Sequence, residues 1–184
     1  MIAELWGKRL QLLKEALPRV AHVALLFAPA DAGAVPQVKE IEAAAPRLAL
    51  RVSPFELRQP VDIEPALKRA VASGVGACVV TVDAFTNNQR QVIADHLPRL
   101  KVPAMFAASH YVEPGGLMSY GASLTDNFRR AAAYADKIFK GAKPGDLPVE
   151  QPTKFELAVN MKTANALGVE LPESFMPSVT RVIE

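Results

Sequence analysis

Apolar residues run almost unbroken through three short segments in the first 110 residues of the chain. These segments are HVALLFA at 22–28, GACVVTVD at 76–83 and VPAMFAA at 102–108. Runs of this length and continuity are typical of strands that are covered on both faces, as in a parallel sheet. A fourth strand, less apolar than the others, is expected at 49–57.

Segments with helical spacing lie between these strands, at residues 35–48, 62–74 and 88–100, and Asn87 or Asn88 is the expected cap of the third. Residues 1–20 also predict an amphipathic surface helix. Alternation of strands and helices at this spacing favours a parallel sheet with helices on both faces. We therefore expect an α/β fold, a three-layer, doubly wound unit with four strands in the first 110 residues.

The last third of the chain follows a different plan. A short strand is expected at 117–121, and Ser123 then begins the strongest amphipathic helix of the sequence, which ends at Gly141. A connector rich in Pro and Gly leads to a strand at 154–160. A short helix follows at 161–167, and the remaining residues are expected to form an irregular tail.

Composition and charge exclude several classes of protein. The net charge of +2 over 184 residues provides little field for gathering nucleic acid. A single cysteine, Cys78, excludes a disulfide scaffold and a multi-cysteine zinc site, and three scattered histidines lack the spacing of metal ligands. The first 20 residues do not have the unbroken apolar core of a signal peptide, and no segment is apolar enough to predict a membrane span. No metal or cofactor is expected.

Polar and aromatic side chains follow the predicted strand at 76–83. In open parallel sheets ligands gather at the carboxyl ends of the strands. Asp83 is suited to hold an ammonium group, Phe85 to stack on an apolar ligand, and Thr86 and Asn87 to form hydrogen bonds. These polar residues are equally suited to cap a helix, and the two roles are compatible.

A catalytic site is not indicated by the motifs. Ser109 and His110 are adjacent, but neighbours on a strand or turn point apart, and no G-x-S-x-G elbow surrounds the serine. Neither G-x-G-x-x-G nor G-x-x-x-x-G-K-[ST] occurs, so the common phosphate-binding loops are absent from the sequence. The residues therefore favour binding over turnover, and we expect no enzyme.

The runs GGLMSYG, ADKIFKGAKPGDLPVEQPTKFEL and NMKTANALG closely match a known family. They resemble the ABC-transporter substrate-binding proteins of the tryptophan and tyrosine type, which have the type I periplasmic-binding-protein fold. The opening ELWGKRLQLLKEALPRVAHVALLF is similar to the segment where such chains enter their second lobe. The resemblance implies that this chain corresponds to the C-terminal portion only, with the leader peptide and most of the first lobe missing.

The resemblance implies a domain plan and a function. Residues 1–117 would form the second lobe, and residues 118–184 the hinge crossings, a helix for the first lobe, a returning strand and a C-terminal helix and tail. The intact protein would bind an amino-acid-like molecule in the cleft between its lobes and deliver it to an ABC permease from the periplasmic or another extracytoplasmic side. The residues expected to face the ligand are Pro29, Asp31, Asp83, Ala84, Phe85, Thr86, Phe106, Ser109 and Tyr120.

Without a first lobe, the helix at 124–140 would need another surface for its apolar face. We expect it to pack on its own lobe or to form a homodimer with a second copy. Two other functions stay open: the effector-sensing core of a transcription regulator, and a flavodoxin-like enzyme. The first would need a DNA-binding segment and the second a phosphate loop or a catalytic pair.

Overall fold

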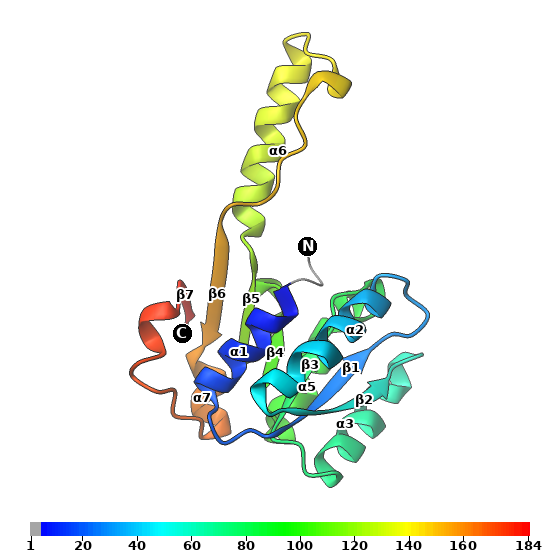
Figure 1. The fold of residues 1–184 in the computed structure, drawn as a ribbon, viewed down its shortest axis with the longest axis vertical. Coiled ribbons are helices and arrows are strands. Elements are labelled where there is room, and N and C mark those ends of the chain that lie inside the picture. Colours follow the sequence, from blue (N-terminus) through cyan, green and yellow to red (C-terminus); the bar gives the residue numbers. More distant parts are fainter. Residues whose placement is uncertain (1–4) are drawn as a thin grey trace.

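The computed structural model describes residues 5–184, and its strands form one seven-stranded sheet (Figure 1). The sheet order is β2-β1-β3-β4-β5-β6-β7. The first five strands in this order run parallel, β6 is antiparallel to β5, and β7 is parallel to β6. The strands are β1 (His22–Phe27), β2 (Arg51–Glu56), β3 (Ala77–Val80), β4 (Ala104–Phe106), β5 (Met118–Ala122), β6 (Phe155–Asn160) and β7 (Arg181–Ile183).

Helices cover both faces of this sheet, so the predicted α/β class is confirmed. Apolar residues of α1, α2 and α7 join one core cluster, and those of α3 and α5 join another on the opposite face. Apart from α6, the α-helices of the described residues are α1 (Trp6–Ala16), α2 (Ala34–Ala44), α3 (Ile63–Ala72), α4 (Ala84–Asn88), α5 (Arg90–Arg99) and α7 (Met161–Leu167). The part of the predicted N-terminal helix at residues 1–4 lies outside the described residues.

The inner strand β1, which lies between β2 and β3, shows why its apolar run is continuous. Val23 and Leu25 enter the cluster beneath α1 and α2, whereas Ala24 and Leu26 enter the cluster beneath α3 and α5. All four side chains are fully buried. Because successive side chains of a strand point to opposite faces, a strand covered on both faces must be apolar at every position.

The predicted cap of the helix near residue 88 is wrong. The chain forms two helices here: α4 is capped by Asp83, whose side chain accepts from the backbone N–H of Thr86, and α5 begins after Gln89 without a side-chain cap. The first backbone N–H groups of a helix have no partner within the helix, and the capping box of Asp83 and Thr86 provides partners for them. The helical segment therefore begins about one turn before the expected cap at Asn87 or Asn88. Asn87 lies inside α4 instead of at its start.

Residues 123–153 form an arm that projects from the sheet (Figure 1). It consists of α6 (Leu124–Phe139) and the connector that returns to β6. The predicted Ser123 cap is confirmed, since its side chain accepts from the N–H of Asp126. The connector is held by an ion pair between Arg130 and Glu150 and by the hydroxyl of Tyr134, which donates to the carbonyl of Pro148 at 2.6 Å.

None of the α6 residues is buried, so the helix does not fold back on its own lobe as one of our expectations required. Its open face carries an apolar stripe at helical spacing, in which Phe128 is 74% exposed and Phe139 is 89% exposed. The apolar stripe consists of Leu124, Phe128, Ala132, Ala135 and Phe139.

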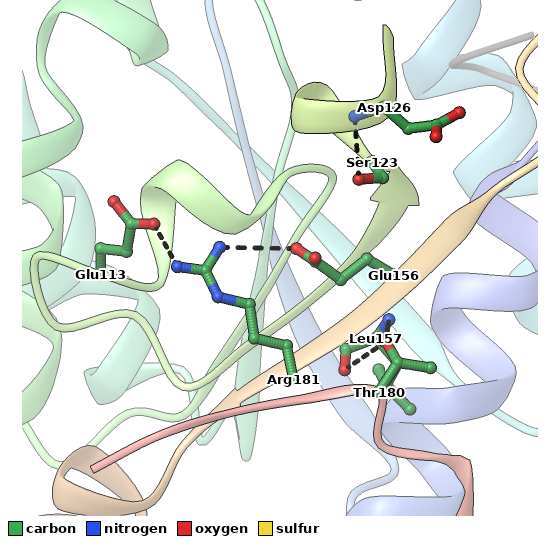
Figure 2. A network of polar contacts seen from close by, with 7 residues as sticks. All are labelled: Glu113, Ser123, Asp126, Glu156, Leu157, Thr180 and Arg181. Carbon is green, nitrogen blue, oxygen red and sulfur yellow. Dashed lines mark hydrogen bonds and ion pairs between the residues drawn. The ribbon is translucent and has the colours of Figure 1, made fainter. Parts of the chain in front are cut away.

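The C-terminal tail contains a strand that the sequence did not predict. Thr180 accepts through its hydroxyl from the N–H of Leu157 at 2.8 Å, and β7 then pairs with the second half of β6. Figure 2 shows Arg181 between two carboxylates, 2.7 Å from Glu113 and 3.6 Å from Glu156. The tail therefore extends the same sheet that contains β1–β4, and the division of the chain at residue 117 stays a prediction.

Within residues 5–184, no helix combines the length and the hydropathy that crossing a membrane requires.

Candidate functional site

Three loops meet at the carboxyl edge of the parallel strands. We use "carboxyl edge" for residues 28–33 after β1, 81–86 after β3 and 107–111 after β4. These strands are neighbours in the sheet and run in the same direction, so their ends lie side by side. This is the position where open α/β sheets bind ligands.

Asp31 ties two of these loops together. Its Oδ1 accepts from the N–H of Gly33 at 2.7 Å, and its Oδ2 accepts from the N–H of Ala84 at 3.0 Å. These two backbone bonds, with that of Ala84 the stronger influence, hold the pKa of Asp31 below its ordinary value. The predicted site residues Asp31 and Ala84 are thus brought together, although 53 positions separate them in the chain.

Asp83 has a structural role at the second loop. Its Oδ1 accepts from the N–H of Thr86 at 2.7 Å, and its Oδ2 accepts from the hydroxyl of Thr81 at 2.8 Å. The side chain is 6% exposed, and Thr86 is fully buried. The capping alternative is therefore confirmed, and the carboxylate is already paired at both oxygens. Its contact with a ligand ammonium group stays a prediction.

The third loop contributes His110. Its Nε2 lies 2.9 Å from Oδ1 of Asn87, and because that oxygen only accepts, Nε2 carries the proton. Burial, followed by the charge of Arg90, lowers the pKa of His110, which favours the neutral ring. The ring is tilted against Tyr111, whose pKa burial raises to about 12. The Nδ1 atom is buried and has no hydrogen-bond partner among the described residues.

The other predicted site residues are not all at the surface of the carboxyl edge. Phe106 is only 1% exposed and stacks on Tyr111 with ring centroids 5.2 Å apart, so its side chain belongs to the core. Tyr120 is half-buried on β5 and stacks on Phe155. Pro29, Phe85 and Ser109 are half-buried at the loops themselves. Contact of any of these side chains with a ligand stays a prediction.

A cavity of about 230 Å³ lies where the carboxyl edge meets the base of the arm. Its wall is mostly apolar, with Arg9, His110 and Asn127 as the polar members. None of the nine predicted site residues lines it. The residues that line it are Leu5, Arg9, Val82, Ala107, Ala108, His110, Ala122, Leu124, Asn127, Pro152 and Phe155.

Sequence reasoning overlooked these lining residues for two reasons. Ala107 and Ala108 directly follow a predicted buried strand, so their position was available, but small apolar side chains carry no chemical signal. Arg9 lies in the segment that predicts an amphipathic surface helix, where a charged side chain is expected to face solvent. In the structure Arg9 is buried, its Nε donates to the carbonyl of Tyr120 at 2.7 Å, and burial lowers its pKa to about 10.

The described residues include no cluster of three or more His, Cys, Asp or Glu side chains that could hold a metal ion. Cys78 lies in β3, fully buried, and burial raises the pKa of its thiol to about 12. A protonated, inaccessible thiol is a poor nucleophile. The carboxyl edge therefore belongs to an α/β lobe and offers a concave surface with hydrogen-bonding groups, the kind of surface on which small-molecule sites are built.

Comparisons with known proteins agree with this class. The family model for ABC transporter substrate binding proteins matches residues 3–183, so the chain belongs to this family. No curated protein sequence matches the chain.

Three solved structures show the same fold. A protein from Streptococcus pneumonia in complex with L-Trp has 26% identity and a TM-score of 0.83, with 98% of this chain and 62% of that chain covered. A conserved domain protein from Vibrio cholerae has 24% identity and a TM-score of 0.83, covering 96% and 60%. A ligand-free, open substrate-binding protein with adhesive properties from Clostridium difficile has 21% identity and a TM-score of 0.73, covering 96% and 59%. The chain thus spans about 60% of their length.

Proposed function

We propose that this chain is the C-terminal portion of the solute-binding component of an ABC importer. It would contribute one wall of a cleft that binds an amino-acid-like small molecule, and the intact protein would pass the solute to a permease from the periplasmic or another extracytoplasmic side. The family membership supports solute binding, and the complex of the Streptococcus pneumonia protein with L-Trp supports an amino-acid-like ligand.

One observation carries the proposal: the arm leaves the lobe at the carboxyl edge. β5 is parallel to β4, and its carboxyl end continues through Ser123 into α6 (Figure 1). A second α/β body seated on the apolar stripe of α6 would therefore face the loops that hold Asp31, Asp83 and His110. A ligand between two such walls loses most of its contact with water, as in typical small-molecule sites.

The predicted homodimer, in which a second copy would cover the apolar stripe, stays a prediction. Exposed apolar patches of this kind mark interaction surfaces. Size-exclusion chromatography with light scattering distinguishes the two cases. A monomer at high protein concentration would contradict the homodimer and leave the two-lobed arrangement in place.

Calorimetry with a panel of amino acids tests the binding function. One wall supplies only part of the contact area, so we expect the chain alone to bind weaker than micromolar. A two-lobed protein that carries this chain should bind at least one member of the panel tightly. Sub-micromolar binding by the chain alone would contradict the proposal that it forms only one wall of the cleft. The absence of binding heat with the two-lobed protein would reject amino-acid-like ligands.

A further inference from the structure

The side chain of Gln37, on α2, holds two loops of the carboxyl edge from inside the core. It is 3% exposed. Its Nε2 donates to the carbonyls of Gly33, at 2.8 Å, and Val82, at 2.6 Å. Its Oε1 accepts from the N–H of Val82 at 3.0 Å and from Nε1 of Trp6 at 3.1 Å. A carboxamide offers two donors and two acceptor sites, so this one is fully used.

The contact with Val82 resembles a sheet pairing. Both backbone polar groups of Val82 are bound by the Gln37 amide, as a neighbouring strand would bind them. Val82 directly precedes Asp83, the cap of α4, and is the second residue after β3, which ends at Val80. The amide therefore fixes the backbone from which the second loop of the carboxyl edge begins. It fixes the first loop as well, through Gly33.

A second set of contacts connects Gln37 to β5, which we call the crossing strand because it leads into the arm. Trp6 is fully buried, and the guanidinium carbon of Arg9 lies 4.7 Å from the centre of its ring. The same guanidinium donates through Nε to the carbonyl of Tyr120, on β5, which leads into the arm. Val82, Gln37, Trp6, Arg9 and Tyr120 thus form an unbroken path of contacts.

We infer that Gln37 is a positioning residue of the candidate ligand site and that Trp6 and Arg9 connect it to the crossing strand β5. The inference rests on the proposed function, because the carboxyl edge is taken as the ligand wall. Gln37 sets the backbone of Val82 and Gly33, and Arg9 sets the ring that orients Gln37. A shift of the β5 backbone, where the arm joins the lobe, is therefore transmitted to the loops of the carboxyl edge through the side chains of Arg9, Trp6 and Gln37.

Amide NMR of the labelled chain tests the path without any ligand. The sequence has one tryptophan, so the indole N–H of Trp6 gives a single resonance. Substituting Arg9→Lys keeps the charge but removes the Nε donor and the planar group over the ring. We expect this substitution to shift the amide resonances of Val82 and Gly33. The shift of Gly33 is the more direct test of the path, because Val82 lines the same cavity as Arg9 and Gly33 does not.

The matched control is Arg47→Lys, at an exposed arginine outside the path. It should leave the resonances of Val82 and Gly33 in place. If Arg9→Lys also leaves them in place, the connection between β5 and the carboxyl edge is refuted. A melting temperature unchanged from the wild-type value separates a local change in geometry from general destabilisation.

The role of Gln37 itself is tested by Gln37→Met, which keeps the length of the side chain and removes its polar atoms. The Val82 amide should exchange with solvent at least about tenfold faster, because its buried partner is lost. If this variant fails to give a dispersed spectrum, Trp6→Phe removes the indole donor together with part of the buried ring and should still shift Val82. Unchanged Val82 resonances and exchange would overturn the inference.

The consequence for binding is measured separately with L-tryptophan as the probe, followed at the amide resonance of Ala84. We expect Gln37→Met to weaken binding at least about tenfold. This factor corresponds to the loss of one or two of the hydrogen bonds by which Gln37 holds the loops of the carboxyl edge. Gly145→Ala, on the arm, should bind as the wild type does. If the wild type does not bind L-tryptophan, the carboxyl edge of this chain is not a site for that solute, while the ligand-free result still decides the path. Equal binding by Gln37→Met and wild type would refute the positioning role.

Discussion

Gly121 lies where the crossing strand β5 passes the end of β4. A Cβ atom placed on this residue would lie 2.0 Å from the carbonyl oxygen of Ala107 and 3.2 Å from its carbonyl carbon. Its φ is not in the left-handed region, so space alone decides what a substitution does. We predict that Gly121→Ala forces β5 away from β4 and destabilises the chain.

The size of the effect follows from the overlap. Real Cβ atoms essentially never approach other heavy atoms closer than 3.0 Å, so the two strands would have to separate by on the order of an ångström. Over-packing of this kind costs about 1–3 kcal/mol. In a domain of this size each kcal/mol lowers the melting temperature by about 2–4 °C. The expected decrease is therefore about 2–12 °C.

Urea and thermal unfolding, both followed by circular dichroism, measure this difference, and Gly145→Ala is the matched control. A Cβ on Gly145 meets nothing within 4 Å, and its φ is also outside the left-handed region. Any gain from the lower entropy of the unfolded chain is similar in both variants, since both replace Gly with Ala. If the free energies of unfolding of Gly121→Ala and Gly145→Ala differ by less than about 0.5 kcal/mol, the close approach of β5 to β4 is refuted.

Three further predictions concern a cap, a carboxylate and a thiol. Ser123→Ala should lower the helical signal of α6 and cost about 0.5–1 kcal/mol, because the arm buries no helical side chain and depends on local bonds; an unchanged circular dichroism spectrum would contradict this. The pKa of Asp31 is held below 3.8 in the folded chain, so its bond to the Ala84 amide stabilises the loops at pH values above the unfolded pKa and is lost as the pH falls through the folded pKa. Asp31→Asn should therefore remove the pH dependence of the Ala84 amide resonance. If that pH dependence persists in the variant, another group causes it. Cys78 should react with a thiol reagent only in urea, because it is fully buried with a pKa of about 12, and fast reaction of the native chain would show that β3 opens.

Local features of the sequence predicted much of this fold. The continuous apolar runs identified β1, β3 and β4, because a strand covered on both faces has no polar position. The Ser123 cap and the glycine that closes α7, Gly168 with a φ of 67°, are also local signals. Each depends on groups within a few residues, so its partners are close in the sequence as well as in space.

Features that depend on distant partners could not be predicted. β7 has three residues and forms because β6 presents an unpaired edge, and its anchor Arg181 reaches Glu113, 68 positions away (Figure 2). Gln37 and Arg9 have the sequence signature of exposed helix positions. Only the tertiary fold shows that their partners Val82 and Tyr120, 45 and 111 positions away, lie beside them in the core.

The candidate site was predicted in part for the same reason. The rule that ligands gather at the carboxyl ends of parallel strands located the carboxyl edge, and Asp31 and Ala84 do meet there. It could not show that Phe106 points into the core or that the cavity near the arm is lined by Val82 and Ala108 instead. Side-chain direction at a strand end depends on the exact residue at which the strand stops, which sequence patterns do not fix.

An amide NMR titration of the labelled chain with L-tryptophan, L-tyrosine and L-leucine, each at millimolar concentration, tests the central claim most directly. It detects the weak binding expected of one wall and shows where the solute binds. We predict that at least one of the three shifts resonances of residues 28–33, 81–86 and 107–111 together. Shifts confined to the opposite edge of the sheet, or none with any of the three, would contradict a solute site at the carboxyl edge.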